Sequence, residues 1–262
     1  MALLEVQNIS KRFKKHKKEL LAVNNISFTV EQGECLGLVG ESGCGKSTTA
    51  GIIARLIKED SGTIKFSGKK VNNGFYLKPL GRDVQMIFQN PQDSFDPRDT
   101  LIEGVKQGAL SYKIWNKEEL DKKAREVIEY VGLKDKYSNI KISELSGGEC
   151  QRAAIARAII CSPKLLICDE ATSALDVLVQ AQIVALLKRL KHDLGMSMLF
   201  ITHDIPLSAV LCDRIAVMNN GSIVECGETE KVLNYPEHEQ SRRLIDAARS
   251  VSIGVSRGNY YE

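Results

Sequence analysis

The sequence predicts an α/β fold built on a mostly parallel sheet. A glycine-rich loop at residues 40–47 follows an apolar run at 35–39 and precedes a helix-compatible segment at 47–57. Two later apolar runs, at 164–170 and 197–204, end in acidic residues and flank a predicted helix at 177–194. Strand, loop and helix in this order are typical of parallel sheets. The 262 residues are sufficient for one large domain with an insertion.

The remaining elements follow from hydrophobic spacing. Apolar patterns at 3–9, 21–34 and 61–71 predict strands separated by turns. Between about residues 90 and 163 the apolar residues recur every three or four positions, most clearly at 117–133. This spacing predicts an inserted group of helices. An Asn-Gly pair inside residues 214–228 predicts a hairpin. A short helix is expected at 239–250.

Composition and charge exclude several classes of protein. The chain is 43% hydrophobic and 26% charged, an ordinary globular composition. Its net charge of +3 is concentrated at residues 11–18, where a solvated hairpin or loop is favoured over a nucleic-acid or membrane-surface patch. We therefore expect no nucleic acid partner. The seven cysteines show no CxxC spacing, which favours a reducing compartment over a disulfide framework.

The glycine-rich loop GESGCGKS matches the P-loop pattern in its required context of a strand before and a helix after. Its glycines let backbone N–H groups face phosphates, Lys46 reaches the phosphate oxygens, and Ser47 binds Mg²⁺. We therefore expect a nucleotide and Mg²⁺ as cofactors, and a thiol reagent that alkylates the loop cysteine should block turnover of the nucleotide. The residues expected to bind the nucleotide here are Gly40, Glu41, Ser42, Gly43, Cys44, Gly45, Lys46, Ser47 and Thr48.

Two carboxylates end the apolar run at 164–170. Asp169 can hold Mg²⁺ through water, and Glu170 can orient and deprotonate a water molecule for attack on the γ-phosphate. Beside a P-loop, this pair predicts nucleotide hydrolysis. A second anion-binding sequence, LSGGECQR at 145–152, begins another predicted helix.

Six motifs in order resemble those of the ATP-binding subunit of an ABC transporter. They are the P-loop, a glutamine after a strand (Gln89), LSGGE at 145–149, KLLICDE at 164–170, SALD at 173–176 and ITHD with His203. The resemblance covers about residues 3–235. It implies a P-loop NTPase cassette with a RecA-like core (1–89 and 164–235), an antiparallel β-subdomain, an inserted α-helical subdomain (90–163) and a C-terminal extension (236–262).

The family also implies roles for single residues. Gln89 would sense Mg²⁺ and the attacking water, and His203 would contact the γ-phosphate, so that both act with Glu170 in catalysis. Phe13 would stack on adenine, although a plain core role is the alternative.

In this family two cassettes pair head to tail, and the signature of one closes on ATP held by the other. The resemblance therefore implies that Asp176 bridges the two sites and that the partner's ATP is bound by Ser146, Gly147, Gly148 and Glu149. Two positions depart from the family pattern: Glu149 replaces the usual glutamine and Ala171 the usual proline. Because a negative side chain suits a helix start, we expect little loss of binding from Glu149.

Residues 85–100 and 235–248 resemble the group of peptide and nickel importers. Ala171 and the short C-terminus favour nickel or a nickel complex as cargo over a peptide. In this group, two permease subunits receive two usually non-identical ATPases at the cytoplasmic face of the membrane, and an extracytoplasmic solute-binding protein delivers cargo. Residues 90–100 would receive a permease coupling helix. The alternatives are an exporter motor, a soluble ABC ATPase acting on DNA or ribosomes, and a small-molecule kinase.

Overall fold

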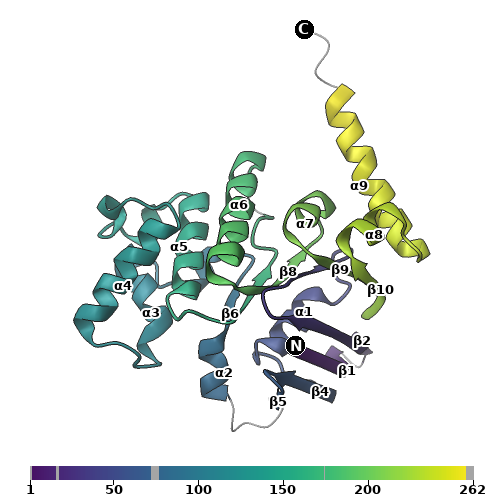
Figure 1. Cartoon of the computed structure of the whole chain (residues 1–262), viewed down its shortest axis with the longest axis horizontal. Helices are drawn as coiled ribbons and strands as arrows, with labels where there is room; N and C mark the ends of the chain where they lie inside the picture. Colours follow the sequence, from purple (N-terminus) through teal and green to yellow (C-terminus); the bar gives the residue numbers. More distant parts are fainter. Residues whose placement is uncertain (1, 16–17, 72–76, 174, 258–262) are drawn as a thin grey trace.

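The computed structural model describes residues 2–15, 18–71, 77–173 and 175–257. Within these ranges the strands form one parallel sheet with an antiparallel edge strand and one antiparallel sheet (Figure 1). Three inserted helices gather on the left of Figure 1, away from the antiparallel sheet at the lower right. The predicted α/β fold with a mostly parallel sheet is therefore confirmed.

The larger sheet has the strand order β10-β9-β3-β8-β7-β6 among the described residues. Neighbours pair in parallel except for β10, which runs antiparallel to β9. Its strands are β3 (Cys35–Val39), β6 (Val84–Ile87), β7 (Leu165–Asp169), β8 (Ser197–Thr202), β9 (Arg214–Asn219) and β10 (Ser222–Glu228). Because β3, β7 and β8 are buried along their whole length, they are continuous apolar runs. Their carboxyl ends share one edge of the sheet, which is where ligands bind in such folds.

The antiparallel sheet has the order β2-β1-β4-β5 in the described ranges. Its strands are β1 (Ala2–Lys15), β2 (Lys18–Glu31), β4 (Ser61–Phe66) and β5 (Lys69–Lys70). β1 and β2 form a hairpin in which Lys15 pairs with Lys18. The basic run at 11–18 therefore lies in this hairpin, as expected, although residues 16–17 are outside the described residues.

The helices confirm most of the predicted pattern. They are α1 (Lys46–Ile53), α2 (Leu77–Asp83), α3 (Leu101–Leu110), α4 (Lys117–Tyr130), α5 (Gly147–Ile159), α6 (Val177–Leu194), α7 (Ile205–Leu211), α8 (Thr229–Asn234) and α9 (Glu239–Arg257). Helix α1 ends earlier than predicted because Arg55 is left-handed (φ 62°) and the N–H groups of Leu56 and Ile57 return to the Gly51 carbonyl. Helix α9 extends further than predicted. No helix in the described ranges is long and apolar enough to span a membrane.

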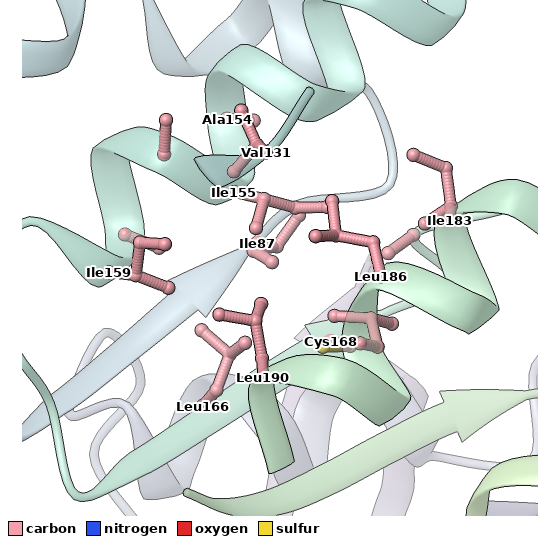
Figure 2. Close-up of a cluster of buried hydrophobic side chains, with 14 of the residues drawn as sticks. Ile87, Val131, Ala154, Ile155, Ile159, Leu166, Cys168, Ile183, Leu186 and Leu190 are labelled. Atoms are coloured by element: carbon pink, nitrogen blue, oxygen red, sulfur yellow. The ribbon is translucent and has the colours of Figure 1, made fainter. Parts of the chain in front are cut away.

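A buried cluster joins the inserted helices to the sheet (Figure 2). Its members come from β6, β7, α5, α6 and the residue that ends α4, and they include Ile87, Val131, Ala154, Ile155, Ile159, Leu166, Cys168, Ile183, Leu186 and Leu190. Since α5 packs on the edge strand β6, the LSGGE segment at its start is held by the same core as the sheet. The predicted boundaries of the helical subdomain and of the C-terminal extension stay predictions.

Candidate active site

The P-loop connects β3 to α1. Gly45 precedes the helix with φ 111°, and a Cβ there would overlap the carbonyl oxygen of Ala22. Lys46 is buried, and its Nζ donates to the carbonyl oxygens of Gly40 at 2.8 Å and Glu41 at 2.9 Å. No ion pair in the described part of the chain involves Lys46, although a buried ammonium group is costly without an opposite charge. The loop therefore fits an anionic ligand.

Ser47 links the P-loop to the end of β7. Its Oγ donates a hydrogen bond to Asp169 Oδ1 at 2.9 Å, and the Asp169 side chain is buried. Burial raises the pKa of the Asp169 carboxyl, the Ser47 hydrogen bond lowers it, and the negative charge of Glu170 raises it. A hydroxyl and a carboxylate at this distance are oxygen ligands of the type that Mg²⁺ prefers. These residues fit the predicted metal site.

Gln89, Glu170 and His203 meet around one carboxylate. Gln89 Nε2 donates to Glu170 Oε2 at 3.0 Å, and His203 Nδ1 lies 3.6 Å from Glu170 Oε1. Glu170 has a left-handed backbone (φ 47°), and its N–H donates to the Ile201 carbonyl oxygen on β8. Such a conformation is rare outside glycine and costs energy, and it often occurs at functional sites. A glutamine and a histidine that flank one carboxylate can orient a water molecule beside a base.

A pocket of about 400 Å³ lies beside these groups. Its lining comes from the β1–β2 hairpin, the P-loop, the β6 and β7 ends and the β9–β10 turn, and comprises Phe13, Leu20, Leu21, Ala22, Ser42, Gly43, Gly45, Lys46, Ser47, Thr48, Gln89, Glu170, Asn220 and Gly221. Phe13 is 37% exposed and lines the pocket, which disfavours the alternative of a core role. The pocket combines apolar walls with a loop suited to phosphate.

Sequence reasoning missed five of the pocket residues: Leu20, Leu21, Ala22, Asn220 and Gly221. The Asn-Gly turn was predicted, but nothing in its sequence indicated that it lies beside the P-loop. The Gly221 N–H donates to the Cys44 carbonyl oxygen at 2.9 Å, and the Gly221 carbonyl accepts from Asn24 at 2.8 Å. The turn therefore ties the loop to β2.

The LSGGE segment begins α5 with a capping box. Ser146 Oγ lies 3.3 Å from the Glu149 N–H, and Glu149 Oε2 accepts from the Ser146 N–H at 2.9 Å and from its hydroxyl at 2.7 Å. Hydrogen bonds from Ser146 lower the pKa of the Glu149 carboxyl. The Glu149 carboxylate therefore keeps its negative charge and accepts hydrogen bonds from Ser146, the N-cap residue of the helix.

The signature glycines lie against the start of α6. A Cβ on Gly147 would lie 3.6 Å from Leu175, and one on Gly148 would lie 2.7 Å from Val179. Asp176 caps α6 by accepting from the Val179 N–H at 3.0 Å. Among the residues that the structure describes, no signature residue lines the P-loop pocket. The two predicted anion-binding segments are thus separate within one chain.

Residues 23–173 match the family described as ABC transporter. The chain belongs to the ABC transporter family. This ABC cassette is 40% identical over 249 residues to the oligopeptide transport ATP-binding protein OppF of Streptococcus mutans, with 94% of this chain and 81% of OppF covered. It is 39% identical over 254 residues to the glutathione import ATP-binding protein GsiA of Pectobacterium atrosepticum, covering 94% of this chain and 41% of GsiA.

Two solved structures share the ABC cassette fold. The dimeric post-hydrolysis structure of the ATP-binding cassette MJ0796, bound to ADP and Pi, has a TM-score of 0.78 and 30% identity, and covers 86% of this chain and 98% of its own. CbiO1 from Clostridium perfringens has a TM-score of 0.79 and 25% identity, over 96% and 99% of the two chains. These likenesses confirm the predicted cassette fold with its antiparallel sheet and helical insertion.

The ABC cassette is thus an ATPase whose cofactors are ATP and Mg²⁺. The buried Lys46, the Ser47 hydroxyl and the Asp169 carboxylate are the groups suited to hold the phosphates and the metal.

Proposed function

We propose that this ABC cassette is the ATP-hydrolysing motor subunit of a binding-protein-dependent importer of peptides. The observation that carries the proposal is the convergence of Gln89, Glu170 and His203 at the edge of a P-loop pocket. The named relatives import oligopeptides or glutathione, which favours a peptide over the nickel cargo that the sequence alone favoured. Nickel becomes the alternative outcome of the test.

The chemistry follows from the side chains around the pocket. Glu170 accepts a proton from the attacking water, Gln89 orients that water, and His203 contacts the γ-phosphate. Lys46 supplies positive charge to the phosphates. Mg²⁺, when bound, neutralises charge on the phosphate oxygens, and Ser47 and Asp169 would hold it. Phe13 offers an aromatic face to adenine.

A second cassette completes the site in this proposal. The separation of the signature from the chain's own pocket supports closure of Ser146, Gly147, Gly148 and Glu149 on ATP held by a partner. The relative MJ0796 is dimeric. In such a pair ATP favours the closed state and hydrolysis releases it, a population shift that can drive a membrane partner. Asp176, beside the signature, would bridge the two sites.

The proposed assembly contains three kinds of partner for this cassette. Two permease subunits would contact residues 90–100, where Asp96 and Arg98 form an exposed pair at 2.7 Å. A second, non-identical ATPase would pair head to tail, and a solute-binding protein outside would deliver cargo. The cassette would occupy residues 1–235, at the cytoplasmic face of the membrane as a peripheral subunit, with 236–262 as an extension.

Uptake measurements test this function directly. Cells carrying the wild-type gene, Glu170→Gln or the control Glu118→Gln, an exposed carboxylate on α4, are supplied with a labelled oligopeptide, labelled glutathione or labelled nickel. We expect Glu170→Gln alone to abolish uptake of a peptide. If Glu170→Gln abolishes nickel uptake alone, the role as a transport motor stands, and the cargo is nickel and not a peptide. Unchanged uptake of all three would overturn the importer role.

A further inference from the structure

The signature serine is engaged within its own chain. A serine hydroxyl has one proton to donate, and that of Ser146 is donated to Glu149 Oε2 at 2.7 Å. The Ser146 N–H points to the same oxygen at 2.9 Å. The family resemblance implies that Ser146 binds a phosphate. Both of its donors, the N–H and the hydroxyl, are instead directed to the Glu149 carboxylate.

The carboxylate keeps its negative charge in this arrangement. The Ser146 hydrogen bonds come first among the causes that lower the pKa of Glu149, followed by Tyr137. The positive charge of Lys136 also lowers the pKa of Glu149, and this exposed ammonium lies 5.2 Å from the centre of the Tyr137 ring. One exposed lysine screens Glu149 only weakly. A phosphate that approaches the start of α5 therefore meets a like charge.

We propose that Glu149 opposes closure of the cassette pair, because its carboxylate, held beside Ser146 by the capping box, presents a negative charge where the partner's nucleotide must dock. This inference rests on the head-to-tail pairing in the proposed function. It is an alternative to the expectation from sequence that Glu149 causes little loss of binding. The negative side chain stabilises the helix start, but the same charge disfavours a phosphate there. Glu149 is thus a positioning residue that raises the ATP concentration needed for closure.

The chain offers a matched control. Thr100 and Glu103 form the same capping box at the start of α3, with Thr100 N–H to Glu103 Oε2 at 2.9 Å and hydroxyl to Oε2 at 2.7 Å. A glutamine at this position of a helix also completes a capping box. Glu149→Gln and Glu103→Gln therefore each remove one negative charge from an equivalent helix cap. Only Glu149 belongs to the LSGGE signature.

The test uses the solubilised transporter complex, isolated through a tag on this chain so that its natural partner is present. All variants carry Glu170→Gln to prevent turnover, and the ATP concentration for half-maximal retention of labelled ATP after gel filtration is measured. At about 50 mM salt we expect Glu149→Gln to lower that concentration about fivefold. At about 500 mM salt the difference should shrink below about twofold, because salt screens exposed charges. Glu103→Gln should change neither value.

Three other outcomes would contradict the inference. Equal ATP requirements for Glu149→Gln and Glu103→Gln at low salt would overturn the inference while leaving the pairing intact. A difference that salt does not reduce would assign Glu149 a structural role instead. Failure of the Glu170→Gln parent to retain ATP at all would overturn the pairing, and the role of Glu149 with it.

Discussion

Ser47 Oγ lies 2.9 Å from Asp169 Oδ1 and donates a hydrogen bond to it across the gap between the P-loop and β7. Burial raises the pKa of Asp169, and this hydrogen bond lowers it. The Ser47 hydroxyl therefore helps to keep Asp169 in the charged form that binds a metal ion. Removing the hydroxyl leaves a buried carboxyl whose charged form is less stable.

Ser47→Ala should therefore weaken Mg²⁺ binding by about 10- to 100-fold, while Ser47→Thr, which keeps a hydroxyl, should retain most of it. Since the Asp169 pKa lies above that of an ordinary aspartate, the Mg²⁺ requirement should rise as pH falls, beginning at a higher pH in Ser47→Ala than in the wild type. Mg²⁺ titrations of ATPase activity over a pH series measure this. A Ser47→Ala profile that overlays the wild type would contradict it.

His203→Ala should lower kcat by about 10²- to 10⁴-fold with little change in ATP binding, since His203 lies beside Glu170 at 3.6 Å. His192→Ala is the control, because His192 is an exposed histidine that contacts Asp193 at the end of α6. Steady-state phosphate release and equilibrium nucleotide binding separate the two effects. Comparable kcat values for the two variants would remove His203 from the chemistry.

Alkylation of Cys44 should be slow at neutral pH. The residue is only 7% exposed, and burial raises the pKa of its thiol, while the positive charge of Lys46 lowers it. The reactive thiolate is therefore scarce, and the rate should increase as pH rises beyond about 9. Mass spectrometry of iodoacetamide-treated protein should find the exposed Cys226 modified first. Fast Cys44 modification at pH 7 would restore the simpler expectation from sequence, a reagent-sensitive P-loop.

Gly45→Ala should destabilise the fold more than Gly43→Ala. Both glycines have positive φ, 111° and 80°, but a Cβ on Gly45 meets the Ala22 carbonyl oxygen and one on Gly43 meets nothing within 4 Å. We expect a further loss of about 1–3 kcal/mol in the free energy of unfolding for Gly45→Ala. Urea denaturation measures both variants, and equal values would mean that backbone conformation alone decides the cost.

Leu190→Ala should cost about 2–5 kcal/mol in the free energy of unfolding. Leu190 is fully buried in the cluster between α6, α5 and β7 (Figure 2), while Leu194 on the same helix is 53% exposed. Leu194→Ala should change stability by no more than about 0.5 kcal/mol. Thermal or urea unfolding of the pair tests whether this cluster holds the inserted helices on the sheet.

The positions of Asp169, Glu170 and His203 could be predicted because each lies at the carboxyl end of a strand of one parallel sheet or directly after it. Carboxyl ends of parallel strands share an edge. The contribution of Leu20 or Asn220 could not be predicted, since it depends on how the antiparallel sheet lies against the parallel one. Helix α2 was also missed, because its sequence LKPLGRD contains a proline and a glycine, which disfavour helix on propensity.

The central place of β3 governs when the nucleotide pocket can form during synthesis. β3 pairs on one side with β8 and on the other with β9, so both of its neighbours lie more than 150 residues later in the chain. The pocket also needs Asn220 and Gly221 from the turn after β9. A ribosome therefore exposes the P-loop long before the strands that frame it exist. We therefore expect the nascent amino-terminal part to lack a complete ATP site, and a chain truncated before β9 to lose nucleotide binding.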